Sequence, residues 1–240
     1  MFTSSYKIYG QKNSKVVIVF AGWGVRQWHL WLLGQLFTSY GFKAIILTWD
    51  KTLLTTDPGL TVQHFMSVKN KCLEIISQLP KRQQQHLSLF ALSQGTGVAL
   101  MVANAVPRLE SIVLNLSGAD LAEIVWTWSK TVPELKKSLR KKKFSLSSLK
   151  KLWAPISPVN NLSQIKVKRV LVYLAMRDER IPFTQQERLV AAFKEHGIPV
   201  NGIINTRHHH LLSELINLLK FDIYMSFLKG ERTNTLLRGH

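Results

Sequence analysis

Short apolar runs alternate with longer amphipathic stretches along most of the chain. Runs rich in Val, Ile, Leu and Phe predict buried strands, and amphipathic stretches predict helices. Strands that alternate with helices indicate repeated βα units, and therefore an α/β protein with a mostly parallel sheet flanked by helices. The predicted strands are 16–21, 44–48, 87–92, 111–116, 169–176 and 200–205, and the predicted helices are 28–40, 61–79, 95–105, 185–196 and 211–228.

The alternation breaks for about fifty residues in the span 118–168, which lies between two predicted strands. We therefore expect a single domain over 1–240, with this span as an insertion packed over one edge of the sheet. Within it, 134–153 mixes basic runs with apolar residues at helical spacing, which predicts one or two short amphipathic helices in a small, basic, cap-like insertion. The polar segment 229–240 is expected to be a flexible tail.

Composition limits the class of protein. The chain has 240 residues, 46% of them hydrophobic, which is enough for a substantial core and argues against disorder. A single cysteine, Cys72, excludes an internal disulfide and a multi-cysteine metal site. The first residues lack the apolar run of a secretory signal, and no apolar run approaches the ~20 residues of a membrane-spanning helix. These features predict a cytoplasmic protein.

The net charge of +18 implies attraction to nucleic acid, anionic lipid or acidic protein surfaces. Basic residues are concentrated between Leu135 and Arg177, where twelve Lys and Arg residues occur without one Asp or Glu. This stretch lacks the aromatic and glycine interleaving of single-strand nucleic-acid binders, which argues against nucleic acid as a partner. The remaining interpretations are a solvated charged face, which charge runs usually are, or a surface for an acidic carrier protein, a phosphate-bearing acyl group or anionic lipid.

The strongest local motif is Phe90-Ala-Leu-Ser93-Gln-Gly95-Thr-Gly97, which follows a predicted strand and opens a predicted helix. This is the context of a nucleophile elbow, a sharp turn that needs small residues two positions before and after the serine. Those positions hold Ala91 and Gly95, whereas the usual pattern has glycine at both. A serine that caps a helix would produce the same local pattern without any catalytic role. The interpretation therefore depends on further motifs.

Two further motifs follow in the order expected for a catalytic triad. Ala175-Met-Arg-Asp178-Glu-Arg-Ile-Pro182 follows a predicted strand, and Thr206-Arg-His208-His-His-Leu-Leu-Ser-Glu214 follows the last strand and opens the last helix. With these motifs the chain, over about residues 7–228, resembles the α/β-hydrolase superfamily, whose triad order is Ser, acid, His. It is similar to the cap-poor esterase, thioesterase and acyl-peptidase-like members and matches no single family closely.

The resemblance implies that Ser93 is the nucleophile and Asp178 the acid of a Ser-His-Asp triad. The alternative interpretation of Asp178 is that it caps a helix and has no catalytic role. Asp120, directly after the fourth predicted strand, is the rival acid, because some hydrolases carry their acid there.

The same resemblance places the base among three consecutive histidines. His208 is the first candidate, because Leu211 and Leu212 follow three and four residues later, which matches the apolar spacing after the family's histidine. His209 would serve instead if the loop were one residue longer. Without a catalytic role, the three histidines would form a polar turn.

The oxyanion hole of such an enzyme uses two backbone N–H groups. The resemblance implies one donor at Gln94 and the other at Trp23, in a loop where many relatives carry His-Gly and this chain carries Ala-Gly. Trp23, Trp28 and Trp126 are candidates for an apolar acyl pocket, and core packing is the alternative for each.

The resulting hypothesis is a serine hydrolase that cleaves a small carboxylic ester or thioester through an acyl-enzyme. No cofactor or metal is expected, because the glycine pairs at 22–24 and 95–97 lack the full dinucleotide or Walker pattern, and no helical His pair has a third ligand. The alternatives are an acyl-peptidase or acyltransferase with the same triad, and an inactive hydrolase-fold binding protein.

Overall fold

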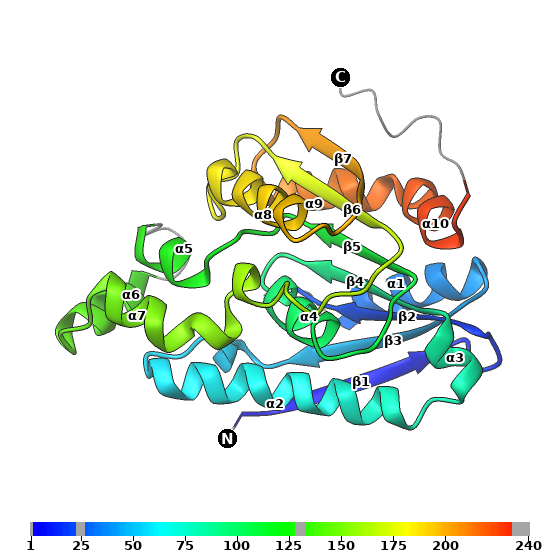
Figure 1. The fold of residues 1–240 in the computed structure, drawn as a ribbon, viewed down its shortest axis with the longest axis horizontal. Coiled ribbons are helices and arrows are strands. Elements are labelled where there is room, and N and C mark those ends of the chain that lie inside the picture. The colour runs from blue at the N-terminus through cyan, green and yellow to red at the C-terminus, as the bar shows by residue number, and fades with distance from the viewer. Residues whose placement is uncertain (1, 23–26, 128–132, 232–240) are drawn as a thin grey trace.

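A computed structural model of the chain describes residues 2–22, 27–127 and 133–231. Its centre is a seven-stranded sheet with the order β1-β3-β2-β4-β5-β6-β7 (Figure 1). Strand β1 pairs antiparallel with β3, and all other neighbouring pairs are parallel. The strands are β1 (Ser4–Tyr9), β2 (Lys15–Phe20), β3 (Phe42–Trp49), β4 (Leu87–Leu92), β5 (Ser111–Asn115), β6 (Val170–Ala175) and β7 (Val200–Thr206).

The α/β architecture with a mostly parallel sheet is as predicted, and all six predicted strands are present. Strand β1 was not predicted. Its sequence, Ser-Ser-Tyr-Lys-Ile-Tyr, is polar and only partly buried, because it lies at the edge of the sheet. The hydrophobic pattern of a buried strand is therefore absent from it.

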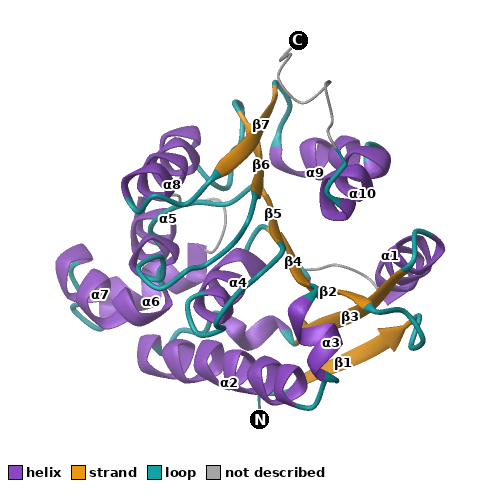
Figure 2. Ribbon diagram, turned by 45° about the vertical axis from the view of Figure 1, so that its right-hand side comes forward, coloured by secondary structure: helices purple, strands orange, loops and turns teal. Residues whose placement is uncertain are grey.

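Helices cover both faces of the sheet (Figure 2). Helices α2, α4 and α8 lie on one face, and α1, α9 and α10 lie on the other. Each face has its own apolar core, with Phe65 and Val98 in one and Phe37 and Tyr224 in the other. The helices are α1 (Gln27–Ser39), α2 (Pro58–Ser77), α3 (Lys81–Gln85), α4 (Gly95–Ala103), α5 (Leu121–Thr127), α6 (Pro133–Lys141), α7 (Leu146–Trp153), α8 (Phe183–Glu195), α9 (His210–Leu219) and α10 (Phe221–Lys229).

The strand order places a topological switch point beside β2. The chain passes from β2 to β3 on one side and then crosses to β4 on the other side of β2. Open parallel sheets bind ligands outside the carboxyl ends of the strands at such a point. Gly22 follows β2 there, and Ser93 follows β4.

Helices α5, α6 and α7 lie between β5 and β6 in the chain and beyond the carboxyl ends of the central strands in space (Figure 1). The single closing helix predicted over 211–228 is instead two helices, α9 and α10, which are separated at Lys220. The reason is that the apolar side changes direction there: α9 leaves Leu219 77% exposed, whereas α10 buries Phe221.

Two sequence-based expectations concern the ends of the chain and membranes. Residues 232–240 of the predicted flexible tail lie outside the described residues. In the ranges that are described, no helix combines the length and the apolar character needed to cross a membrane.

Candidate active site

Ser93 occupies a strained turn between β4 and α4. Its φ of 47° is in the left-handed region, which a non-glycine residue adopts rarely and at a cost of about 1–3 kcal/mol. The turn is held by the Ser93 N–H, which donates to the Asn115 carbonyl at 2.8 Å, and by the Ser93 carbonyl, which accepts from the Thr96 N–H at 3.1 Å. A strained serine between a strand and a helix is the geometry of a nucleophile elbow.

The flanking residues show why the turn needs small side chains. A Cβ atom on Gly95 would lie 2.5 Å from the Phe20 carbonyl oxygen, so the backbone of β2 leaves no room for any side chain there. Ala91, on the other side of the serine, is completely buried in β4. Glycine is thus required at the second position, whereas the fold accommodates alanine at the first.

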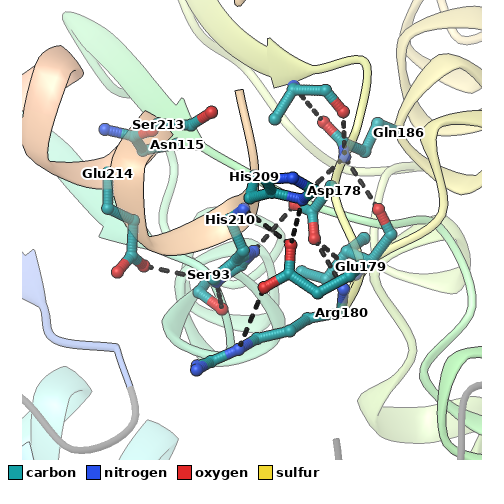
Figure 3. A network of polar contacts seen from close by, with 12 residues as sticks. Ser93, Asn115, Asp178, Glu179, Arg180, Gln186, His209, His210, Ser213 and Glu214 are labelled. Atoms are coloured by element: carbon teal, nitrogen blue, oxygen red, sulfur yellow. Dashed lines mark hydrogen bonds and ion pairs between the residues drawn. The ribbon is translucent and has the colours of Figure 1, made fainter. Parts of the chain in front are cut away.

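A hydrogen-bonded chain begins at the half-buried Ser93 and continues through two buried side chains. The Nε2 atom of His210 lies 3.1 Å from the Ser93 hydroxyl, and its Nδ1 atom lies 2.7 Å from Oδ2 of Asp178 (Figure 3). His210 is 1% exposed and Asp178 is 5% exposed. With the proton on Nδ1, the imidazole donates to the carboxylate and offers Nε2 to the serine hydroxyl. This is the hydrogen-bonding order of a serine-hydrolase triad.

The histidine in this position is neither of the two predicted ones. His208 is exposed, and His209, 71% exposed at its side chain, faces Glu179 with Nδ1 3.4 Å from Oε2. The candidate base is therefore corrected from His208, or its rival His209, to His210. The prediction assumed that Leu211 and Leu212 mark the inward side of the last helix, but both are exposed, and the inward side begins at His210.

Asp178 is oriented by its own turn. Its Oδ1 accepts the backbone N–H groups of Arg180 and Ile181, both at 2.8 Å. Gln186, which is fully buried on α8, donates from Nε2 to Oδ2 at 3.3 Å and also to the Ile181 carbonyl at 2.8 Å. Gln186 was not predicted, although a polar residue on the inward side of an otherwise apolar helix stripe was a readable signal.

The rival acid has another role in the structure. Asp120 accepts the Glu123 N–H at 3.0 Å through Oδ1, which caps the first turn of α5, and its Oδ2 lies 3.6 Å from Nζ of Lys150. Its carboxylate therefore stabilises the start of the insertion, whereas the carboxylate that contacts the imidazole belongs to Asp178.

A second carboxylate also reaches the imidazole. Oε1 of Glu214 lies 3.5 Å from Nε2 of His210, one helical turn further along α9. Burial lowers the pKa of His210, but its contacts with Asp178 and Glu214 outweigh burial and raise the pKa to about 9. The Glu214 contact was not predicted, although the His-x-x-x-Glu spacing places the two side chains on one side of a helix.

The inward side of α9 is tied to the sheet by hydrogen bonds. Ser213 and Thr206 share one at 2.7 Å, and Nδ2 of Asn217 donates to Oδ1 of Asn115 at 2.8 Å. Asn115 in turn donates to the Tyr224 hydroxyl at 2.8 Å, while its backbone carbonyl accepts from Ser93. One buried asparagine therefore links the backbone of the nucleophile to the helix that carries the imidazole.

A cavity of about 80 Å³ adjoins Ser93 and His210. The insertion contributes Leu121, Ile124 and Val125 from α5, and the acid turn contributes Arg180 and Ile181. Its walls are therefore mostly apolar, with one cationic side chain. The other lining residues are Leu54, Phe65, Gln94, Thr96, Gly97, Gly118 and Pro158.

The predicted tryptophan pocket is not what lines this cavity. Trp28 is 58% exposed on α1, and Trp126 packs against the core with the guanidinium of Arg140 5.9 Å from its ring centre. Trp23 lies outside the described residues. Trp28 lies on a helix, but its side chain is exposed and does not face the cavity. Trp126 packs against the core, which was the alternative interpretation of this residue.

One of the two predicted oxyanion donors can be located. Gln94 follows Ser93 and precedes the first turn of α4, where backbone N–H groups have no intrahelical acceptor and the helix dipole favours negative charge. The second predicted donor, the N–H of Trp23, lies outside the described residues. Within the ranges that are described, no three His, Cys, Asp or Glu side chains are grouped so that they could hold a metal ion.

Comparisons with known proteins agree with this fold. The family model of the prolyl oligopeptidase family matches residues 114–229, and no curated protein matches the chain. A 2,6-dihydroxy-pseudo-oxynicotine hydrolase shares 17% identity and a TM-score of 0.63, covering 97% of this chain, which spans 66% of that protein's length. A sugar hydrolase of Lactococcus lactis has 14% identity and a TM-score of 0.69, with 95% and 94% of the two chains covered. An esterase of Pyrococcus furiosus has 14% identity and a TM-score of 0.63, with 95% and 90% covered.

The strand pairings and the order of the site residues along the chain agree with these matches. The sheet has one antiparallel edge strand followed by five parallel pairings, with Ser93 after β4 and Asp178 after β6. His210 follows β7, so the three residues occur in the chain order of the superfamily. The chain therefore has the α/β-hydrolase fold, and its residues 114–229 match the prolyl oligopeptidase family model.

Proposed function

We propose that the protein is a serine hydrolase that cleaves a carboxylic ester or thioester through an acyl-enzyme, with Ser93, His210 and Asp178 as its triad. The observation that carries the proposal is the chain of hydrogen bonds from the Ser93 hydroxyl through His210 to the buried Asp178, at 3.1 and 2.7 Å. A neutral imidazole in this position can accept the serine proton during attack.

The reaction has two halves. The Ser93 oxygen attacks the acyl carbonyl while its proton passes to Nε2 of His210, and Asp178 stabilises the resulting imidazolium. The imidazolium then returns that proton to the leaving alcohol or thiol as the carbon–oxygen or carbon–sulfur bond breaks, which leaves the acyl group on Ser93. Water, deprotonated by the same imidazole, attacks the acyl-enzyme, and the products are a free acid and the regenerated serine. The Gln94 N–H supports the negative oxygen in both tetrahedral intermediates.

The cavity supports a small acyl group. Leu121, Ile124 and Val125 make one wall apolar, and a volume of about 80 Å³ favours a short acyl chain over a long one. Two solved structures with the same fold are named as esterases, one of Pyrococcus furiosus and an acetyl xylan esterase of Thermoanaerobacterium. Small esters are therefore the first substrates to test.

Cleavage of an acyl-peptide bond is the second candidate. The observation in its favour is the match of residues 114–229 to the prolyl oligopeptidase family model, which spans the insertion, Asp178 and His210. The same triad serves either bond, so the leaving group distinguishes the two candidates.

The experiment combines covalent labelling with a substrate panel. We expect a fluorophosphonate probe to label the wild type and to leave Ser93→Ala unlabelled. Among p-nitrophenyl esters, acetate and butyrate should be turned over faster than decanoate, and acyl-peptide anilides slower than either. The function would be refuted if the wild type stayed unlabelled, which would favour an inactive binding protein. Faster cleavage of the anilides would favour the second candidate.

A further inference from the structure

Helix α9 is oriented with its polar side inward and its apolar side outward. His210, Ser213 and Asn217 are buried and hydrogen-bonded to the sheet side, as described above. The opposite side carries four exposed leucines, with exposed fractions of 58%, 45%, 56% and 77% for Leu211, Leu212, Leu215 and Leu219. An ordinary surface helix has the reverse arrangement. The outward leucines therefore need an apolar environment that the described residues do not supply.

Helix α1 has an outward side of similar character. Trp28, Trp31 and Leu32 are 58%, 56% and 44% exposed, and no Asp, Glu, Lys or Arg occurs anywhere in Gln27–Ser39. Among the described residues, twelve large apolar side chains are exposed, and seven of them lie on α1 and α9. Isolated exposed apolar residues are normal, but such concentration on two elements marks an interaction surface.

The two helices lie on the same face of the sheet and start at its carboxyl edge (Figure 2). Helix α1 follows β2, and α9 follows β7 and begins with His210 itself. A Cβ on Gly22, after β2, would lie 3.6 Å from Oε1 of Glu214, so the end of β2 and the first turns of α9 are close together. We call the exposed residues of α1 and α9, from Trp28 to Leu32 and from Leu211 to Leu219, the leucine–tryptophan surface. Its α9 part begins directly after His210, whose Nε2 lies 3.1 Å from the Ser93 hydroxyl.

Exposed basic residues lie near both ends of α9. Arg177 and Arg207 are exposed where β6 and β7 end, and Lys220 is exposed directly after α9. Of the nearby acids, Glu214 faces His210 and Glu179 faces His209, and Asp222 is exposed on α10. The whole chain carries a net charge of +18. An apolar surface with exposed basic residues nearby, on a chain of strongly positive net charge, complements an anionic lipid interface, where tails contact Leu and Trp and headgroups contact Lys and Arg.

We propose that the leucine–tryptophan surface binds the protein to an anionic lipid surface and so presents the Ser93 site to substrates in or near that surface. Charge favours lipid over a second copy of the chain, because a copy would bring a second net charge of +18 to the same contact. The proposal concerns binding and does not require that the proposed hydrolase activity exists.

The test is co-sedimentation with vesicles, with the protein in its Ser93→Ala form so that no lipid is cleaved. Vesicles of phosphatidylcholine with phosphatidylglycerol are compared with vesicles of phosphatidylcholine alone. The test variant carries Leu211→Gln, Leu215→Gln and Leu219→Gln. The matched control carries Leu60→Gln and Leu152→Gln, exposed leucines of α2 and α7. Circular dichroism and urea unfolding establish that all forms are folded.

We expect the protein to bind the anionic vesicles and to bind phosphatidylcholine alone at least about tenfold more weakly, because both the apolar and the electrostatic contributions are needed. The triple variant should lose about tenfold or more of the partition, while the control stays within about twofold. Binding should shift the emission of Trp28 and Trp31 to shorter wavelength, and Trp28→Gln with Trp31→Gln should remove that shift.

Three results would overturn the proposal. The first is that the protein with an unchanged leucine–tryptophan surface does not co-sediment with anionic vesicles. The second is that the triple variant and the control partition equally. The third, seen by light scattering without lipid, is a dimer that the triple variant converts to a monomer, which would assign the surface to a second copy of the chain.

Discussion

Helices α8 and α9 both pack beside the last two strands, and they use their two sides in opposite ways. Helix α8 buries Leu189, Val190 and Phe193 against the core and exposes charged residues such as Glu187 and Lys194. Helix α9 buries histidine, serine and asparagine and exposes leucine. The inward side of α8 is mainly apolar, so the hydrophobic effect favours its orientation, and the hydrogen bonds of the buried Gln186 add to it. Helix α9 is oriented by buried hydrogen bonds, which are costly to leave unmade.

The difference shows what determines the orientation of the helix that carries His210. Turning α9 by half a turn would bury its leucines, but it would also remove His210 from Ser93 and Asp178 and leave Asn115 without its partner on Asn217. The buried polar groups of the sheet therefore determine the direction of the helix, and the apolar side is left for another use.

The largest expected effect concerns which of the three consecutive histidines acts as the base. His210→Ala should lower kcat/KM for a p-nitrophenyl ester by about 10⁴-fold or more, because it removes the group that accepts the serine proton. His208→Ala should stay within about twofold of the wild type, since His208 is exposed. Steady-state kinetics with both variants check this. A large loss in His208→Ala with a small one in His210→Ala would reverse the assignment.

The second effect concerns stability and uses a pair of matched exchanges on α9. Asn217→Leu should lower the free energy of unfolding by about 1–3 kcal/mol, because it leaves the buried Asn115 amide without its partner. Leu215→Asn, on the outward side, should change it by less than about 0.5 kcal/mol. Urea unfolding of the two variants measures both values. If Leu215→Asn were the more damaging exchange, the outward side would be packed and the comparison with α8 would fail.

The third effect concerns pH. Catalysis needs the neutral imidazole, and the pKa of His210 is raised to about 9, so kcat/KM should increase as the pH rises toward 9. Glu214→Gln removes one of the carboxylates that raise this pKa, so the midpoint of the profile should move to lower pH by about half a unit to one unit. Glu187→Gln on α8 is the control and should leave the profile unchanged. An unchanged midpoint in Glu214→Gln would contradict the role of the Glu214 contact.

The smallest expected effect concerns the basic residues of the insertion. Unlike the outward leucines of α9, these residues are charged, so their effect should depend on salt. Substituting Gln for Lys136, Lys137, Arg140, Lys141, Lys142 and Lys143 should reduce the salt dependence of kcat/KM for an anionic ester by about threefold or less, because exposed charges are screened over about 8 Å at physiological salt. Turnover of neutral esters should not change. Equal salt profiles in the two proteins would mean that these residues form a solvated face only.

The sequence by itself determined the frame of this protein. The strands were readable because central parallel strands are buried on both faces and leave uninterrupted apolar runs, as in Leu87–Leu92. Ser93 and Asp178 were readable because the turns that carry them need particular residues at short range, such as glycine at Gly95. Strand β1 was not predicted, because an edge strand has no uninterrupted apolar run.

Only the tertiary structure decided which histidine faces Ser93, which side of α9 points inward and which residues line the cavity. His210 is the first residue of α9, whereas His208 and His209 precede the helix, so the choice among the three depends on where the helix begins and how it is anchored. That anchor comes from Asn115, Thr206 and Asp178, which are distant in sequence from the residues they hold. Periodicity identifies the two sides of a helix, but long-range hydrogen bonds determined which side of α9 faces the core.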